Sequence, residues 1–161
     1  MHSDHTQLIA ILEHTPQTLA SITAALPEVA LDFRPSPSEW STREILAHLV
    51  DDEMFVMRTR LERMMKEENP SLLAHDEKAW YRRRNTSRDT LGELLSDFRV
   101  QRAASLGIVK FLRENEWARS AFHPEYGRFT AEQWIGYWGE HDLTHLRQIE
   151  HTLALYGHGR Y

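Results

Sequence analysis

The sequence contains no cysteine, which excludes disulfide bonds, thiolate metal ligands and a cysteine nucleophile. It also lacks any apolar run approaching the roughly 20 residues that are needed to cross a bilayer. Residues 1–14 carry histidine and aspartate where a secretory signal would carry positive charge followed by a long apolar stretch. These absences predict a cytoplasmic protein without a membrane partner.

Positive charge is scarce as well. The chain has 19 basic and 24 acidic residues and a net charge of -5 when histidine is neutral. Nucleic-acid binding depends on a concentrated basic surface that neutralises phosphates. The one compact basic cluster, Arg82, Arg83, Arg84 and Arg88, falls in a predicted loop. We therefore expect no nucleic-acid partner, and a phosphate-contacting loop is the minor alternative.

Glycine and proline are few, with seven and six residues in a chain of 161. Most of the prolines lie in three segments, 27–40, 68–87 and 114–129. Between these segments the apolar residues recur at helical spacing, and no stretch alternates like a half-buried strand over more than a few residues. With 41% apolar and 27% charged residues, the composition is globular and the length suits a single domain over residues 1–161.

The four periodic stretches predict helices over about residues 5–26, 41–64, 86–114 and 130–157. The second and fourth begin with capping boxes, Ser-Thr-Arg-Glu and Thr-Ala-Glu-Gln, whose side chains satisfy free backbone N–H groups. Pro16 predicts a kink or a broken start in the first helix. Four amphipathic helices predict an all-α fold, a four-helix bundle. Two connections are longer than the roughly 2 to 8 residues between simple antiparallel neighbours, so one is expected to cross over the bundle.

Histidines stand where apolar residues are expected. There are ten in the chain, so chance pairs at helical spacing are common, but His141 and His145 lie one turn apart on the apolar side of the last helix. His48 lies beside the apolar row of the second helix, one turn after Glu44 and one turn before Asp52. Because an unpaired buried polar group costs about 1–3 kcal/mol, these imidazoles need partners. Either they bond to carbonyls or a carboxylate within the core, or they hold a metal together.

Three neutral imidazoles are a common ligand set for a catalytic metal, and they leave a coordination position open. Asp52 is the nearest candidate for a fourth ligand or for a residue that orients a ligand. A ferritin-like di-metal site is excluded, because none of the sixteen glutamates is followed by histidine three residues later. A zinc-protease motif is disfavoured, because Asp142 takes the place of the glutamate between His141 and His145, although it could orient a ligand. No serine-hydrolase elbow or nucleotide-binding glycine loop occurs.

Three segments together resemble one family. Residues 40–49 (WSTREILAHL), 123–130 (HPEYGRFT) and 141–149 (HDLTHLRQI) are similar to the motifs of the DinB-like (DinB/YfiT) superfamily. The resemblance spans nearly the whole chain. It implies a four-helix bundle with a non-simple connection, often dimeric, which holds a divalent metal through His48, His141 and His145. The same three residues follow from the helical spacing above.

The leading hypothesis is a metalloenzyme that uses Zn²⁺ or Ni²⁺, both of which imidazole binds well. The resemblance favours transfer of a low-molecular-weight thiol to a small electrophile, with hydrolysis by activated water as the alternative enzyme reaction. Asp52 and Glu44 are the candidates to orient a ligand or accept a proton. A non-catalytic, stress-associated binding bundle is the alternative from a different class. We expect a small-molecule substrate and a homodimer.

Overall fold

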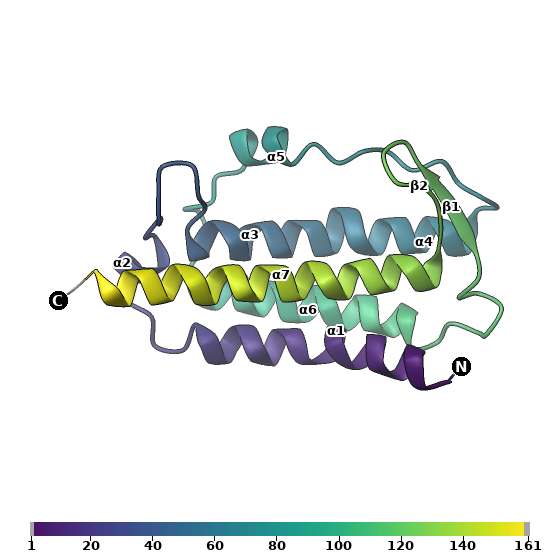
Figure 1. Ribbon diagram of the computed structural model, residues 1–161, viewed down its shortest axis with the longest axis horizontal. Coiled ribbons are helices and arrows are strands. Elements are labelled where there is room, and N and C mark those ends of the chain that lie inside the picture. Colours follow the sequence, from purple (N-terminus) through teal and green to yellow (C-terminus); the bar gives the residue numbers. More distant parts are fainter. Residues whose placement is uncertain (1, 160–161) are drawn as a thin grey trace.

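The computed structural model describes residues 2–159, with side chains from residue 5 onward. Four long helical rods lie side by side along one axis (Figure 1). Three of them are single α-helices, α1 (His2–Ile22), α6 (Leu91–Val109) and α7 (Ala131–His158). The fourth rod joins α3 (Thr42–Asp52), the π-helical segment η1 (Glu53–Met57) and α4 (Arg58–Lys66). The predicted all-α four-helix bundle is confirmed.

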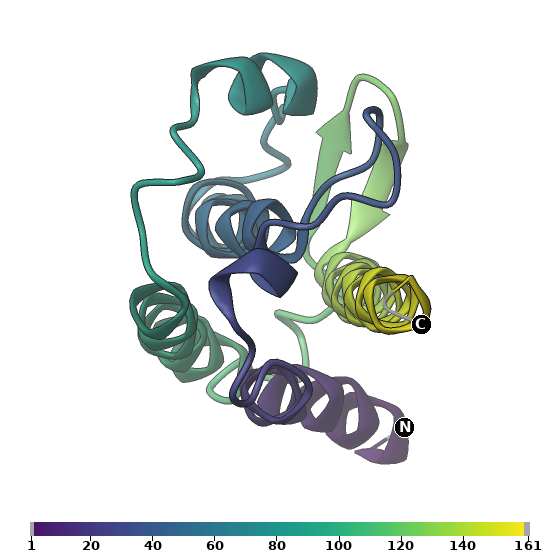
Figure 2. The ribbon, with the colours of Figure 1, turned by 90° about the vertical axis from the view of Figure 1, so that its left-hand side faces the viewer.

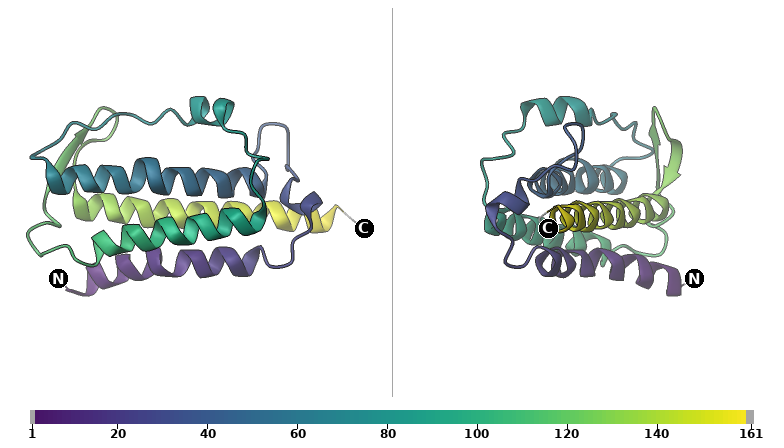
Figure 3. Two further views of the ribbon diagram at one scale, coloured as in Figure 1. Left: turned by 180° about the vertical axis from the view of Figure 1, so that it is seen from behind. Right: turned by 60° about the vertical axis from the view of Figure 1, so that its left-hand side comes forward.

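The order of the rods around the bundle is not that of a simple up-and-down bundle. Viewed from one end, α1 lies diagonally across from α3, and α6 lies diagonally across from α7 (Figure 2). The α3–α4 rod and α6 run in the same direction, so the connection over residues 67–90 returns along the bundle and carries α5 (Glu77–Arg83) on the way (Figure 3). At the start of α3, Arg43 Nη1 donates to the carbonyl of Asp89, which fixes the two parallel starts at the same end. This connection is the crossover that the sequence predicts.

Helix starts follow the local chemistry of their caps. Both predicted capping boxes are present, at residues 41–44 and 130–133. A third capping box, between Thr90 and Glu93, was not predicted. Because this pair satisfies the first free N–H groups, α6 begins at Leu91 instead of near residue 86.

Helix α1 continues through Pro16 without the predicted break, and it ends at Ile22 instead of residue 26. Ala25 follows with a positive φ of 56° in the turn that leaves the helix. Proline has no N–H, so the carbonyl of Leu12 lacks its helical donor. Instead, Nη1 of Arg102 on α6 donates to this carbonyl over 2.8 Å. The backbone group that Pro16 leaves free is therefore satisfied from a neighbouring helix.

A small hairpin precedes α7 and was not predicted. Strands β1 (Ser120–His123) and β2 (Gly127–Thr130) pair antiparallel. Gly127 has φ 72°, the left-handed conformation that closes a short hairpin loop and suits glycine. The start of the crossover connection attaches to this hairpin, because Leu72 N donates to the carbonyl of Phe122 over 2.7 Å and Phe122 N donates to that of Pro70 over 2.9 Å. Strands of four residues are too short to show the alternation that identifies them in a sequence.

The hydrophobic core consists of two clusters, one toward each end of the bundle. On all four rods a buried polar residue falls between the residues of the two clusters: Thr15, Glu53, Arg102 and Asp142. The bundle therefore has a polar layer at mid-height. No helix within residues 2–159 has the length and apolar character to span a membrane.

Candidate metal centre

Helices α3 and α7 direct three imidazoles toward one point. His48 Nε2 lies 3.2 Å from His141 Nε2. One ring nitrogen of each of His48, His141 and His145 lies within 4.8 Å of those of the other two. The rings of His141 and His145 meet edge to face with centroids 4.5 Å apart, and the ring of His48 is 4.7 Å from that of His145. The structure thus brings together the three residues that the sequence selects as ligands.

Burial keeps two of these imidazoles in the form that binds a metal. Burial, followed by the proximity of His145, His141 and His75, lowers the pKa of His48 to about 2. Burial, followed by the proximity of His145 and Arg102, lowers the pKa of His141 to about 3. Both rings are therefore neutral near pH 7, and each keeps a nitrogen lone pair for a ligand.

The outer nitrogens of the rings have different surroundings. Nδ1 of His145 lies 2.8 Å from Oε1 of Gln148. Since an amide oxygen only accepts, this contact places the proton on Nδ1 and leaves Nε2 of His145 free to bind a metal. Nδ1 of His48 is buried and has no hydrogen-bond partner among the described residues.

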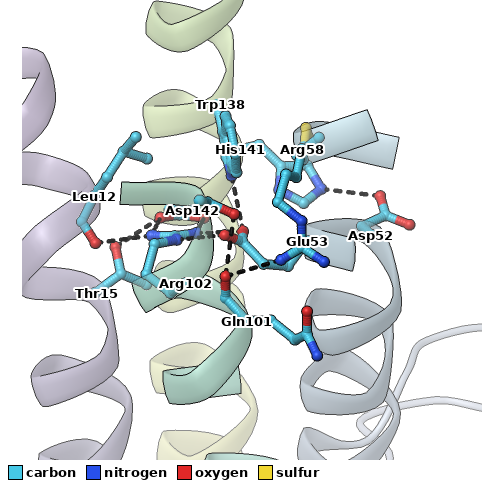
Figure 4. Close-up of polar contacts among 12 residues, drawn as sticks. Leu12, Thr15, Asp52, Glu53, Arg58, Gln101, Arg102, Trp138, His141 and Asp142 are labelled. Atoms are coloured by element: carbon cyan, nitrogen blue, oxygen red, sulfur yellow. Dashed lines mark hydrogen bonds and ion pairs between the residues drawn. The ribbon is translucent and has the colours of Figure 1, made fainter. Parts of the chain in front are cut away.

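Asp52 lies at the edge of the histidine group, as the sequence predicts. Its Oδ2 is 3.5 Å from His48 Nε2 and 3.6 Å from His141 Nε2, and the contact with His141 is drawn in Figure 4. Its Oδ1 is 3.3 Å from Nε2 of His75 in the crossover connection. The Asp52 carboxylate is the main reason why the pKa of His75 is raised. Asp52 thus joins the histidine group to the connection that passes over it.

Glu44 lies one turn earlier on α3 and has different partners. Its carboxylate accepts hydrogen bonds from the Ser41 N–H at 2.8 Å, the Tyr81 hydroxyl at 2.8 Å and Nε of Arg34 at 3.0 Å. Among the described residues, its hydrogen bonds and ion pairs are with these groups and not with the three histidines. Glu44 therefore fixes the start of α3 at one helical turn from His48.

Asp142 follows His141 in the sequence but faces the polar layer inside the bundle (Figure 4). Arg102 donates to both of its oxygens, over 2.6 and 3.0 Å. The same guanidinium donates to both oxygens of Glu53, over 2.8 Å each. All three residues are only 1% exposed. This geometry gives Asp142 a place in a buried ion network, which we call the Arg102 network.

Further contacts from α7 and α1 complete the Arg102 network. The indole N–H of Trp138 donates to Glu53 Oε2 over 2.9 Å, and the hydroxyl of Thr15 donates to Asp142 Oδ2 over 2.7 Å. Together with the bond to the Leu12 carbonyl, Arg102 makes five hydrogen bonds, one for each N–H of its guanidinium. The network therefore links all four rods directly behind the histidine group.

A cavity of about 180 Å³ opens beside the three histidines. Its walls come from four parts of the chain: the α3–α4 rod, α7, the hairpin and the crossover connection. The polar residues that line it besides the histidine group and Asp52 are Arg60, His75, Glu77, His123, Glu125, Tyr126 and Tyr137. Burial, followed by the proximity of Tyr126, raises the pKa of Tyr137 to about 12, so this phenol keeps its proton.

Sequence reasoning missed most of these lining residues. His75 and Glu77 belong to a connection without periodicity, so no pattern assigns them to the site. Two of the missed residues lie on helices, and their spacing from the histidines could have assigned them to the site. Tyr137 lies one turn before His141, and Arg60 continues the four-residue steps from His48.

The residues fit a divalent metal. Three imidazoles converge, an amide oxygen orients one of them, and a carboxylate lies beside them. Imidazole donors suit Zn²⁺, Ni²⁺, Cu²⁺ and Fe²⁺, and with three protein ligands a coordination position stays free for another molecule. The cavity lies on the side where that molecule would enter.

The chain is similar to known bacterial proteins over most of its length. YuaE of Bacillus subtilis, an uncharacterized protein, is 27% identical over 137 residues, with coverage of 78% of this chain and 84% of YuaE. YfiT of B. subtilis, named as a candidate metal-dependent hydrolase, is 23% identical over 142 residues, with coverage of 88% and 79%. OB0782 of Oceanobacillus iheyensis, named in the same way, is 26% identical over 149 residues, with coverage of 86% and 79%.

The fold matches a solved structure. That structure is of B. subtilis YfiT, described as a four-helix bundle of unusual topology, and it superposes with a TM-score of 0.86 over 95% of this chain and 87% of YfiT. Because the two sequences are 22% identical, this match shows that the folds are similar and supports no statement about function. The sequence model of one family, the DinB superfamily, matches residues 11–149. Since that match covers most of the chain, this protein belongs to the DinB superfamily.

Proposed function

We propose that this protein is a divalent-metal-dependent enzyme that acts on a small molecule through His48, His141 and His145. The observation that carries the proposal is the convergence of three imidazoles, two of them kept neutral by burial, at the wall of a cavity. The names of the relatives YfiT and OB0782, candidate metal-dependent hydrolases, support it. We expect Zn²⁺ or Ni²⁺ because of the imidazole donors.

When bound, such a metal lowers the pKa of a thiol or water molecule and polarises an electrophile. The residues of the chain orient the ligands and accept a proton. Gln148 holds His145 in the tautomer that presents Nε2, and we assign to Asp52 the orientation of His48 and the acceptance of a proton. Glu44 supports His48 indirectly, by fixing the start of α3. The volume of about 180 Å³ restricts the enclosed part of the substrate to a small group.

Two reactions fit this arrangement and differ in the nucleophile. Transfer of a low-molecular-weight thiol to a small electrophile is the reaction that the family resemblance favours. Hydrolysis is the reaction that the names of YfiT and OB0782 favour. The two are separated by supplying the metal-loaded protein with one electrophilic ester, with and without a panel of small thiols. Product formation that requires a thiol identifies the transferase, and thiol-independent release of acid identifies the hydrolase.

The metal itself is tested first. Metal content per chain is measured by elemental mass spectrometry on untagged protein purified without chelators. The comparison includes a double variant, His48→Ala with His141→Ala, and a control, His151→Ala, on an exposed position of α7. About one equivalent of metal in the parent and the control, and none in the double variant, supports the proposal. A parent that takes up neither zinc nor nickel would leave the non-catalytic binding bundle as the better description.

The resemblance also predicts a homodimer. Sedimentation of the metal-loaded protein over a range of concentrations gives its mass directly. A mass of one chain, 18.9 kDa, at all concentrations would contradict this prediction.

A further inference from the structure

Three arginines are buried in the part of the chain that the structure describes, and they differ in their partners. Arg43 is paired with the carboxylates of Asp32 and Glu28. Arg102 is paired with two carboxylates in the Arg102 network. Arg60 is 8% exposed and makes no ion pair with any described residue. Since a buried charge is normally paired with an opposite charge, Arg60 is the exception that needs an explanation.

The contacts of Arg60 are all with neutral groups. Its Nη2 donates to the carbonyl of Leu73 over 2.8 Å and lies 3.1 Å from Nε2 of His123. Its guanidinium lies over the ring of Trp134, with 5.0 Å between the guanidinium carbon and the ring centroid. Nε and Nη1 form no hydrogen bond with any residue that the structure describes. These contacts fix the guanidinium in place and leave donors available.

The nearby acids do not neutralise Arg60. Asp52 and Glu125 raise its pKa through space, but burial outweighs them and the pKa is lowered. No carboxylate oxygen of the described residues lies within 4.0 Å of its guanidinium nitrogens. Arg60 nonetheless lines the cavity of the three histidines. A fixed, buried cation with unused donors therefore faces the space in which a substrate would lie.

We propose that Arg60 binds a carboxylate group of the substrate inside this cavity. The unused Nε and Nη1 groups can each donate a charge-assisted hydrogen bond to a carboxylate oxygen. The hydroxyls of Tyr126 and Tyr137, which line the same cavity, are further donors for this group. Since Asp52, Glu77 and Glu125 also face the cavity, a group with one negative charge suits it better than a doubly charged phosphate.

The proposal narrows the substrate class. It rests on the proposed function in one respect only, namely that the bound carboxylate belongs to the molecule that reacts at the histidines. Because Arg60 and the histidines line one cavity of about 180 Å³, the acid group and the reacting group must be separated by only a few bonds. The class is therefore small acid-bearing molecules: thiols that carry a carboxylate, or electrophiles and esters that carry one.

The test is a titration of the metal-free protein with propionate, and with propionamide as its neutral counterpart of the same shape. The signals followed by NMR are the Arg60 Nε–H and the indole N–H of Trp134, which donates to the Met57 carbonyl beneath the guanidinium. Saturable shifts are expected with propionate and none with propionamide. Arg60→Met is expected to weaken propionate binding at least tenfold, and Tyr137→Phe about threefold, because each removes donors to the anion.

Matched variants separate binding from folding. Arg63→Met, one turn along α4, removes a guanidinium that is already paired with Glu67 and should leave propionate binding unchanged. Arg60→Lys keeps the charge and gives intermediate affinity, so it decides the question if Arg60→Met does not fold. Equal shifts with propionate and propionamide, or full binding by either Arg60 variant, would overturn the proposal. Metal uptake by the same sample is measured separately, so failure of the metal proposal and failure of this one give different results.

Discussion

The Arg102 network and the histidine group lie at the same level of the bundle and use neighbouring residues of the same helices, yet their hydrogen bonding differs. In the network every N–H of the guanidinium has an acceptor, and five bonds join the four rods. Among the described residues, Nδ1 of His48 in the histidine group has no hydrogen-bond partner, and the neighbouring Arg60 forms no ion pair. A satisfied polar cluster stabilises a fold, whereas an unsatisfied one at a cavity indicates a ligand.

The largest expected effect is on the Arg102 network. Arg102→Met leaves Glu53 and Asp142 buried without their cation, and removing one partner of a buried pair costs about 3–5 kcal/mol. We expect that loss in the free energy of unfolding, measured by urea denaturation. The matched control is Arg88→Met, which removes an exposed partner of Asp89 and should leave the free energy of unfolding almost unchanged, because exposed ion pairs contribute little. Similar losses in the two variants would mean that the Arg102 network stabilises the bundle no more than an exposed ion pair does.

The next largest effect is expected in the pH dependence of the unfolding free energy of the metal-free protein. His48 has a pKa of about 2 when folded and about 6.5 when unfolded, so below pH 6.5 only the unfolded chain binds this proton. Protonation of His48 therefore costs no stability above pH 6.5, and below that pH it lowers the free energy of unfolding progressively. His48→Leu removes this contribution, and its unfolding free energy should fall by about 2–3 kcal/mol less than that of the parent between pH 6.5 and 4.5.

The control for this pH effect is His151→Leu on the exposed side of α7. Urea denaturation at each pH gives the three curves. If the parent and His48→Leu lost stability in parallel, His48 would not be held neutral by the fold.

A third, smaller effect distinguishes metal binding from folding. Gln148→Leu removes the acceptor that sets the tautomer of His145, and loss of such a partner weakens a metal site about 10- to 100-fold. Competition with a zinc-binding dye measures this affinity. Gln7→Leu, exposed on α1, is the control and should bind zinc like the parent. An unchanged affinity in Gln148→Leu would remove Gln148 from the site.

The smallest expected effect is the change in stability of the metal-free protein at pH 7 when His48 is replaced. At pH 7, without metal, His48→Leu should change the unfolding free energy by no more than about 1 kcal/mol, because it replaces an unsatisfied buried polar group by an apolar one of similar size. Urea denaturation at pH 7 provides the measurement. A loss as large as that of Arg102→Met would mean that the imidazole of His48 stabilises the fold.

The bundle and the three histidines could be predicted because both depend on helical periodicity. The inner row of α7 places His141 and His145 one turn apart, and the capping box at residues 41–44 sets the register that places His48 opposite them. These are local relations, which a sequence shows directly.

The Arg102 network and the cavity walls could not be derived in the same way. Arg102 lies four residues after Phe98 in the inner row of α6, but an arginine at such a position is usually taken as exposed unless its two carboxylate partners are known. Those partners come from α7 and from η1, at separations of 40 and 49 residues. His75 meets the site only because the crossover connection returns over the cavity. Such contacts depend on topology, not on local pattern.

Pro16 also determines how α1 is aligned along its neighbours. In a helix that packs through apolar side chains alone, every interior carbonyl already has its helical donor, so no backbone group distinguishes one position along the axis from the next. In the interior of α1 the carbonyl of Leu12 lacks its helical donor because residue 16 is proline, and it accepts a hydrogen bond from Nη1 of Arg102. A slip of one residue would set Arg102 against a carbonyl that already has a helical donor. The missing N–H of Pro16 thus helps to fix the position of the first helix along its axis.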